Sequence, residues 1–142
     1  HTAKYNIDDD QKLNMIVEEL LRYSTSVHLI GRIPNEDVSI NNYKIKKGDM
    51  VNLCLASANR DEEVFDKASQ FIYDRTPNRH MAFGLGAHFC MGDWLVRIQT
   101  KLMLKTLLTT FDAISLSQEK PKWNDHIAIK SLKALEVSLK RK

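Results

Sequence analysis

Apolar residues recur with helical spacing in two segments of the chain. In the first, one face carries Leu13, Ile16, Val17, Leu20 and Leu21. This i, i+3, i+4, i+7, i+8 pattern is typical of an amphipathic helix, and the aspartates at positions 8–10 offer N-cap residues and a negative charge that the helix dipole favours. In the second, the face carries Leu95, Ile98, Leu102, Met103, Leu107 and Phe111. We predict helices from the aspartates to about Tyr23 and from about Met91 to Phe111.

Shorter apolar runs predict strands. They cover residues 27–33, 38–40, 43–45 and 50–55, and a further alternating run covers residues 134–139. Asn41 and Asn42 lie between two of these runs and suit a two-residue hairpin turn. Another turn is predicted at positions 47–49, around Gly48. Together, the elements indicate an α+β fold that is mainly helical and has small β-sheets.

The stretch from about Asp61 to Phe89 has little periodicity. We predict a long meandering loop there, with a short helix near residues 62–65. Loops of this length are uncommon unless they are functional. The meander leads directly into the second long helix, so its end is the place to look for chemistry.

Composition narrows the classes of protein. The 142 residues are enough for one modest domain, and 43% hydrophobic with 27% charged residues is typical of a soluble protein. A net charge of +3 gives no argument for nucleic-acid binding, and no apolar run approaches the length of a membrane span. The two cysteines, Cys54 and Cys90, are enough for a disulfide by number alone. The hypothesis below requires Cys90 to be free, which suits a reducing, cytoplasmic location.

The most informative segment is the run from Phe83 to Gly92, which reads F-x-x-G-x-x-x-C-x-G. Its glycines permit a tight turn and a close approach of the backbone to a flat ligand. Cys90 stands just before a predicted helix, where the helix dipole favours a thiolate. A lone cysteine is more often a small buried hydrophobe. A phosphate-binding loop is a weaker alternative, because G-K-[ST] and G-x-G-x-x-G are both absent from the sequence.

This run resembles the haem-thiolate loop of the cytochrome P450 superfamily, and the resemblance extends from about Asn14 to the end of the chain. It implies haem b as cofactor and Cys90 as the axial ligand of the iron, whose thiolate pushes electron density toward O–O cleavage. It also implies that Phe83 shields the sulfur and that His88 donates to a haem propionate. Gly84 and Gly92 then give the porphyrin room. Segments 58–61 and 77–80 resemble soluble, bacterial-type members of the superfamily.

A second motif of the superfamily is E-x-x-R, formed here by Glu19 and Arg22. Alone, such a pair is most often a solvated surface pair worth a few tenths of a kcal/mol. The resemblance implies a buried pair that fixes the meander through a third residue, an Arg. Gln70 stands where we expect that Arg, so the triad is expected to be altered, with Arg75 or a backbone carbonyl as the substitute.

The resemblance implies roles for three further groups of residues. Arg32 is expected to bind a haem propionate; the alternative is a surface Arg near acidic neighbours. The run of Val27, His28 and Leu29 is a candidate for substrate contact. A basic stripe, made by Arg97, Lys101 and Lys105 at helical spacing, is either a solvated helix face or a docking face for an acidic redox partner of the ferredoxin or flavodoxin type.

The function implied is that of a P450-type monooxygenase, which inserts one oxygen atom from O₂ into a small organic substrate. Members of the superfamily are about three times longer, and the chain has no counterpart of their oxygen-activating helix. We therefore expect residues 1–142 to be the C-terminal, haem-ligating portion and not the whole catalyst. The alternatives are a haem-thiolate peroxygenase, isomerase or reductase on the same scaffold, or a non-enzymatic structural domain without haem.

Overall fold

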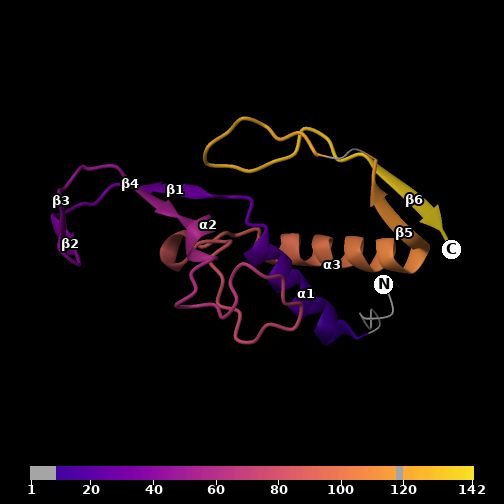
Figure 1. The fold of residues 1–142 in the computed structure, drawn as a ribbon. Coiled ribbons are helices and arrows are strands. Elements are labelled where there is room, and N and C mark those ends of the chain that lie inside the picture. The colour runs from indigo at the N-terminus through magenta and orange to yellow at the C-terminus, as the bar shows by residue number, and fades with distance from the viewer. Residues whose placement is uncertain (1–8, 118–119) are drawn as a thin grey trace.

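The computed structural model describes residues 9–117 and 120–142. Two helices cross at its centre: α1, Asp10–Tyr23, and α3, Asp93–Thr110 (Figure 1). The side chain of Asp9 caps α1 by accepting hydrogen bonds from the backbone N–H groups of Gln11 and Lys12 at 3.0 and 3.1 Å. The two predicted helices are therefore confirmed, and the first begins at the predicted aspartates.

Within the described residues, six strands form three two-stranded antiparallel sheets. β1, Leu29–Arg32, pairs with β4, Val51–Cys54. β2, Val38–Ile40, and β3, Tyr43–Ile45, form a hairpin that protrudes from the rest of the molecule (Figure 1). Its turn is the predicted one, and Asn41 adopts a left-handed φ of 53° there. β5, Phe111–Leu116, pairs with β6, Val137–Arg141, beside the C-terminal end of α3.

Three predicted boundaries are wrong. The strand expected over residues 50–55 ends at Cys54, and a short helix, α2, occupies Leu55–Ala58. The helix expected near residues 62–65 is a single turn, closed by the hydrogen bond from Phe65 N to the Asp61 carbonyl at 2.8 Å. The second long helix ends at Thr110, and the residues that follow form β5, which the helical pattern had hidden.

The long meander runs beside α1 and α2 and packs the small core against them. The buried apolar side chains are Leu13 and Val17 of α1, Leu55 of α2, and Phe65 and Ala68 of the meander. α1 buries two charged residues on the same face, Glu19 and Arg22. The core therefore centres on the E-x-x-R motif and fixes the start of the loop that carries Cys90.

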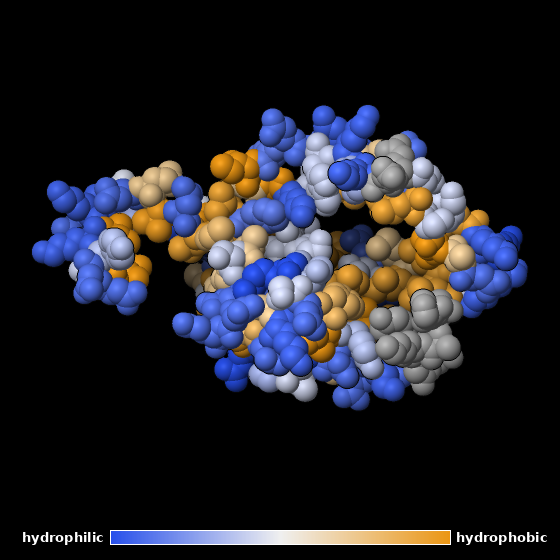
Figure 2. Space-filling model, viewed as in Figure 1, coloured by the Kyte–Doolittle hydropathy of each residue, from blue (hydrophilic) through white to orange (hydrophobic). Residues whose placement is uncertain are grey.

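The other long helix is packed differently. Within α3, which the structure describes in full, none of the 18 residues is buried. Its exposed apolar side chains are Trp94, Leu95, Val96, Ile98, Leu102 and Met103. Hydrophobic surface lines the hollow between the helices and the long loop before β6 (Figure 2). Among the described residues, no helix is both long and apolar enough to cross a membrane.

Candidate functional site

The loop before α3 is tightly turned. Gly84 and Gly86 adopt left-handed φ angles of 73° and 75°, which side chains with a Cβ rarely tolerate. The backbone N–H of Cys90 donates to the carbonyl of Phe83 at 3.1 Å, so the two ends of the motif lie next to each other. A 3₁₀ turn, Gly86–His88, fills the space between them. The glycines therefore shape the loop, as the motif predicts.

Gly92 contributes in another way. It has an ordinary φ of −90° and stands at the N-cap of α3. A Cβ added at this position would lie 3.8 Å from Cys90 Sγ. The sulfur is thus bordered by open space on this side, and Cys90 is an exposed, free thiol, as is Cys54.

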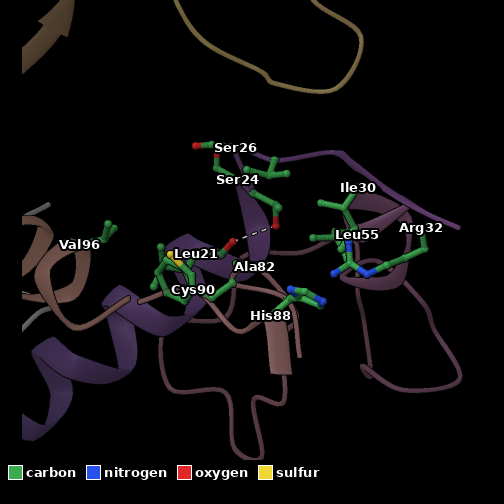
Figure 3. A pocket seen from close by; sticks show the side chains of 14 residues that line it. Leu21, Ser24, Ser26, Ile30, Arg32, Leu55, Ala82, His88, Cys90 and Val96 are labelled. Atoms are coloured by element: carbon green, nitrogen blue, oxygen red, sulfur yellow. Dashed lines mark hydrogen bonds between the residues drawn. The ribbon is translucent and has the colours of Figure 1, made fainter. Parts of the chain in front are cut away.

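A cavity of about 490 Å³ brings six of the predicted site residues together: Val27, Arg32, Phe83, Gly84, His88 and Cys90. Cys90 and His88 reach it from the loop, and Arg32 reaches it from the end of β1 (Figure 3). The other residues that line it are mostly apolar or small: Leu21, Ser24, Thr25, Ser26, Ile30, Leu55, Ala82 and Val96. Arg32 also donates to the carbonyl of Gly31 at 2.8 Å.

This donor set suits a haem. A thiol can ligate iron, apolar walls suit a porphyrin face, and a guanidinium and an imidazole suit carboxylates. By contrast, residues 9–117 and 120–142 contain no group of three or more His, Cys, Asp or Glu side chains that could hold a bare metal ion. The residues that line the cavity therefore fit a haem, which Cys90 would ligate.

The E-x-x-R pair lies behind this cavity and is fully buried. Arg22 donates from Nε and Nη2 to the two carboxylate oxygens of Glu19, each at 2.7 Å, and neither side chain is exposed to solvent. Its remaining hydrogen bonds go to three meander carbonyls, those of Asn59, Ala68 and Gln70, at 2.8–2.9 Å. One guanidinium thus fixes the meander at three points, and the alternative of a solvated surface pair is excluded.

The third residue of the triad is Arg75. Its Nε lies 3.1 Å from Glu19 Oε2, and its side chain is only 7% exposed. Gln70 contributes its backbone carbonyl to Arg22. The expected alteration at Gln70 is therefore confirmed: of the two substitutes considered, Arg75, five residues further along the meander, supplies the ion pair with Glu19.

Sequence reasoning missed two asparagines of the same cluster. Asn59 is fully buried; its Nδ2 donates to Thr25 Oγ1 at 2.6 Å, and its Oδ1 accepts from Met81 N at 2.7 Å. Asn78 Nδ2 donates to Glu19 at 3.2 Å. Burial disfavours the charged form of Glu19, but the hydrogen bonds from Arg22, Ile72 N and Arg75 outweigh it and lower the pKa of this carboxyl.

Comparison with known proteins identifies the family. The family model for Cytochrome P450 matches residues 10–139. The chain belongs to the cytochrome P450 family. It is 38% identical over 128 residues to the polyketide biosynthesis cytochrome P450 PksS of Bacillus subtilis, a match that covers 88% of this chain and 32% of PksS.

Solved P450 structures share the fold. The chain superposes with a TM-score of 0.89 on P450BioI in complex with an acyl carrier protein ligated to hexadec-9Z-enoic acid, at 30% identity, covering 94% of this chain and 35% of that one. The TM-score is 0.87 for CYP109E1 of Bacillus megaterium in complex with corticosterone, at 36% identity. This match covers 95% of this chain and 37% of that one. The chain spans about a third of the length of these P450s.

The basic stripe of this P450 faces α1. Arg97 donates from Nε and Nη2 to the two carboxylate oxygens of Glu18 at 2.6 and 3.1 Å, and from Nη1 to Asp93. Lys101 Nζ lies 2.8 Å from Asp10 Oδ2. The hydrogen bond and the charge of Lys101 lower the pKa of Asp10, and Lys105 adds to this effect through space. The opposite helix therefore supplies acidic partners to Arg97 and Lys101, and docking of a redox partner at this stripe stays a prediction.

A segment that sequence reasoning did not assign lies next to the candidate substrate residues. Val27 forms a β-bridge with Ile129, and His28 N donates to the Ala128 carbonyl at 2.8 Å. The neighbouring Ile127 is 84% exposed. Val27 lines the cavity, whereas His28 and Leu29, the first residue of β1, do not. The alternation of apolar residues at 127 and 129 was the only signal in the sequence, and it was too short to be used.

Proposed function

We propose that this chain is the haem-ligating portion of a P450-type monooxygenase, which inserts one oxygen atom from O₂ into a small organic substrate. The observation that carries the proposal is the convergence of Cys90, His88 and Arg32 on one largely apolar cavity. The family match supports it independently, because haem-thiolate oxygenation is the chemistry typical of cytochrome P450.

In the proposed arrangement each residue has a distinct task. Haem b, when bound, supplies an iron centre whose reactivity is tuned by the axial thiolate. Cys90 provides that thiolate, while Arg32 and His88 bind the propionates. Phe83 keeps water from the sulfur, and Gly84 and Gly92 leave room for the macrocycle. Glu19, Arg22 and Arg75 hold the meander, so that the Cys90 loop keeps its shape.

The surface supports the role of a portion of a larger domain. The chain exposes 10889 Å², whereas a compact monomer of 16.4 kDa exposes about 7500 Å². Six large apolar side chains of α3 are among those exposed. We propose that haem and further protein cover this surface, and that the oxygen-activating residues belong to that further protein.

The substrate-facing side is proposed to include Val27, His28 and Leu29, together with the bridged segment around Ile129. The relatives act in different settings: one is named for polyketide biosynthesis, one was solved with a carrier-bound fatty acid and one with a steroid. These names agree on a largely apolar organic substrate. Electrons are proposed to come from a ferredoxin- or flavodoxin-like partner in the cytoplasm.

The absorption spectrum of the reduced, CO-bound enzyme tests the function. The enzyme that contains this chain is expected to show the red-shifted Soret band of a thiolate-ligated haem. Cys90→Ser removes that band, because an alcohol does not ionise as a thiol does. Cys54→Ser is the matched control, since Cys54 is also an exposed free cysteine but does not line the cavity. A thiolate-type band that persists in Cys90→Ser contradicts the assignment.

A further inference from the structure

We propose that Arg97 is a positioning residue for Phe83 and, through Phe83, for the Cys90 loop. The inference rests on the proposed haem-thiolate function and deepens it. It concerns what we call the Arg97 network: Arg97 and Asp93 of α3, Glu18 of α1, and His80 of the meander. This network lies between the buried E-x-x-R cluster and the Cys90 loop.

Arg97 is held firmly from one side. Glu18 accepts two hydrogen bonds from it, and Asp93, one helical turn earlier, accepts a third. Its side chain is 31% exposed, so these ion pairs are partly shielded from water. Burial disfavours the charged form of Glu18, but hydrogen bonds from His80 and Arg97 outweigh it and lower the pKa of Glu18 to about 2. The guanidinium therefore stays paired with the ionised carboxylate of Glu18.

The guanidinium contacts the haem loop directly. Its central carbon lies 4.8 Å from the centroid of the Phe83 ring, within the range of a cation–π interaction. The Phe83 ring also meets Phe89 edge-on at 6.3 Å, and its backbone carbonyl accepts the N–H of Cys90. Phe83 is thus fixed by Arg97 on its ring and is joined to the ligand cysteine through its backbone.

The same network fixes the chain just before Phe83. His80 has a side chain that is only 3% exposed, and its Nε2 lies 2.9 Å from Glu18 Oε2. Its Nδ1 accepts the N–H of Ala82 at 3.2 Å, so Nε2 carries the proton that is donated to Glu18. Glu18 therefore restrains the chain before Cys90 at two points. It binds His80 directly, and it holds Arg97 against the ring of Phe83.

The competing interpretation is that Arg97 merely ties α3 to α1. Lys101, one turn further along α3, does this through its pair with Asp10 and does not line the cavity. Lys101→Gln is therefore the matched control, because it removes an α1–α3 ion pair without touching Phe83. Arg97→Lys is the test variant, because it keeps the positive charge but loses the planar, bidentate group.

The test is a double-mutant cycle on the haem-loaded enzyme that contains this chain, with Arg97→Lys and Phe83→Leu. The readouts are the haem reduction potential and the Soret position of the reduced CO complex, neither of which a purely structural tie would move. Arg97→Lys is expected to change the ratio of oxidised to reduced haem at a fixed potential by up to about fivefold, the limit reached if a cation–π contact of about 1 kcal/mol acts on one oxidation state only. In the Phe83→Leu background this change disappears, and Lys101→Gln gives none.

Glu18→Gln serves as the second route if Arg97→Lys does not accumulate with haem, because it loosens Arg97 and His80 without altering either. A shift with Glu18→Gln that is lost in Phe83→Leu supports the inference. Equal shifts in the two backgrounds, or no shift at all, overturn the inference and leave the proposed function standing. A wild-type enzyme without a thiolate-type band overturns both.

Discussion

The E-x-x-R cluster and the Cys90 loop lie at the two ends of the same meander, yet they differ in how complete they are. In the cluster, the side chains of Glu19 and Arg22 are fully buried, and their partners all come from this chain. At the loop, His88, Phe89 and Cys90 are exposed, and α3 behind them has no buried residue in its described span, Asp93–Thr110. The chain therefore contains a buried scaffold, the E-x-x-R cluster, and an exposed face at the Cys90 loop, where we propose that haem binds.

The difference has a physical cause. A buried charge without a partner costs several kcal/mol, so a buried ion pair must have its partners in place when the fold forms. Apolar surface carries no such demand for specific partners, and it gains free energy from any cover that removes it from water. The cluster can thus form before haem binds, whereas under the proposed function the loop face would gain most of its burial from haem and from further protein.

The largest loss of stability is expected from a substitution in the buried E-x-x-R cluster. Arg22→Ala removes the bidentate partner of Glu19 and the shared side-chain donor of three carbonyls, and it is expected to lower the free energy of unfolding by about 3–5 kcal/mol. The measurement is denaturant unfolding of the haem-free protein. Lys12→Ala is the control on the same helix, because its pair with Asp9 is 3.8 Å long and exposed, and it should cost less than about 0.5 kcal/mol. Similar losses in both variants would contradict a preformed cluster.

A substitution at the exposed face around the proposed haem site is expected to lower haem affinity without lowering haem-free stability. Arg32→Gln should weaken haem binding about 10–100-fold, since a hydrogen bond to a charged group contributes about 1.5–3 kcal/mol. It should leave haem-free stability unchanged, because Arg32 bonds only to its neighbour Gly31 among the contacts described. Haem titration and unfolding, performed side by side, measure the two quantities. Arg79→Gln is the control, an exposed arginine of the meander that does not line the cavity.

An Arg32 variant that loses stability without haem, or that binds haem as the wild type does, would show that Arg32 belongs to the scaffold. His88→Ala offers an independent check, because His88 reaches the cavity from the loop and not from a strand. Its haem affinity should fall in the same direction as that of Arg32→Gln.

The Arg97 network lies between the two regions, and its contribution to stability is expected to depend on pH. Glu18 has an ordinary pKa of 4.5 and a folded pKa of about 2. Ionised Glu18 therefore stabilises the fold above pH 4.5, and this contribution is lost as the pH falls from 4.5 to about 2. Because the side chain is 31% exposed, solvent screening reduces the effect to about 1–2 kcal/mol.

Acid unfolding of wild type and Glu18→Gln measures this contribution. The variant should lose about 1–2 kcal/mol less than the wild type between pH 4.5 and 2, because it has no carboxylate to protonate at this position. Glu36→Gln removes an exposed carboxylate of the β1–β2 connection and should follow the wild type. Parallel curves for all three proteins would mean that Glu18 does not join the two regions energetically.

Sequence reasoning succeeded where the signal is local. The aspartate cap, the helical face of α1 and the E-x-x-R spacing all lie within one or two turns of helix. It failed where the partner is distant in the sequence. Arg75 meets Glu19 across 56 positions, and β5 pairs with a strand more than twenty residues later. The alternating run at 134–139 predicts a strand but not its partner, and spacing alone could not decide between Arg75 and a backbone carbonyl or end the second helix at Thr110.

The same limit applies to the basic stripe. The spacing of Arg97, Lys101 and Lys105 shows that they share a helix face, but it does not show what lies opposite. The opposing carboxylates belong to α1, some eighty to ninety positions earlier. By contrast, the convergence of Cys90, His88 and Arg32 was predicted, because the resemblance to P450s supplied the long-range information that periodicity lacks.

The smallest loss of stability is expected at the exposed ion pair between Lys101 of α3 and Asp10 of α1. Asp10 is 71% exposed, so water competes for both charges, and Lys101→Gln should cost only about 0.2–1 kcal/mol. Salt should reduce the loss further, since the Debye length falls from about 30 Å at 0.01 M to about 3 Å at 1 M. Unfolding at these two ionic strengths measures the difference. Two results would contradict this expectation: a loss equal to that of Arg22→Ala, or a loss that is unchanged in 1 M salt. Either would mean that the ion pair between α1 and α3 stabilises the fold as strongly as the E-x-x-R cluster does. The contrast between the two regions would then begin only at the Cys90 loop.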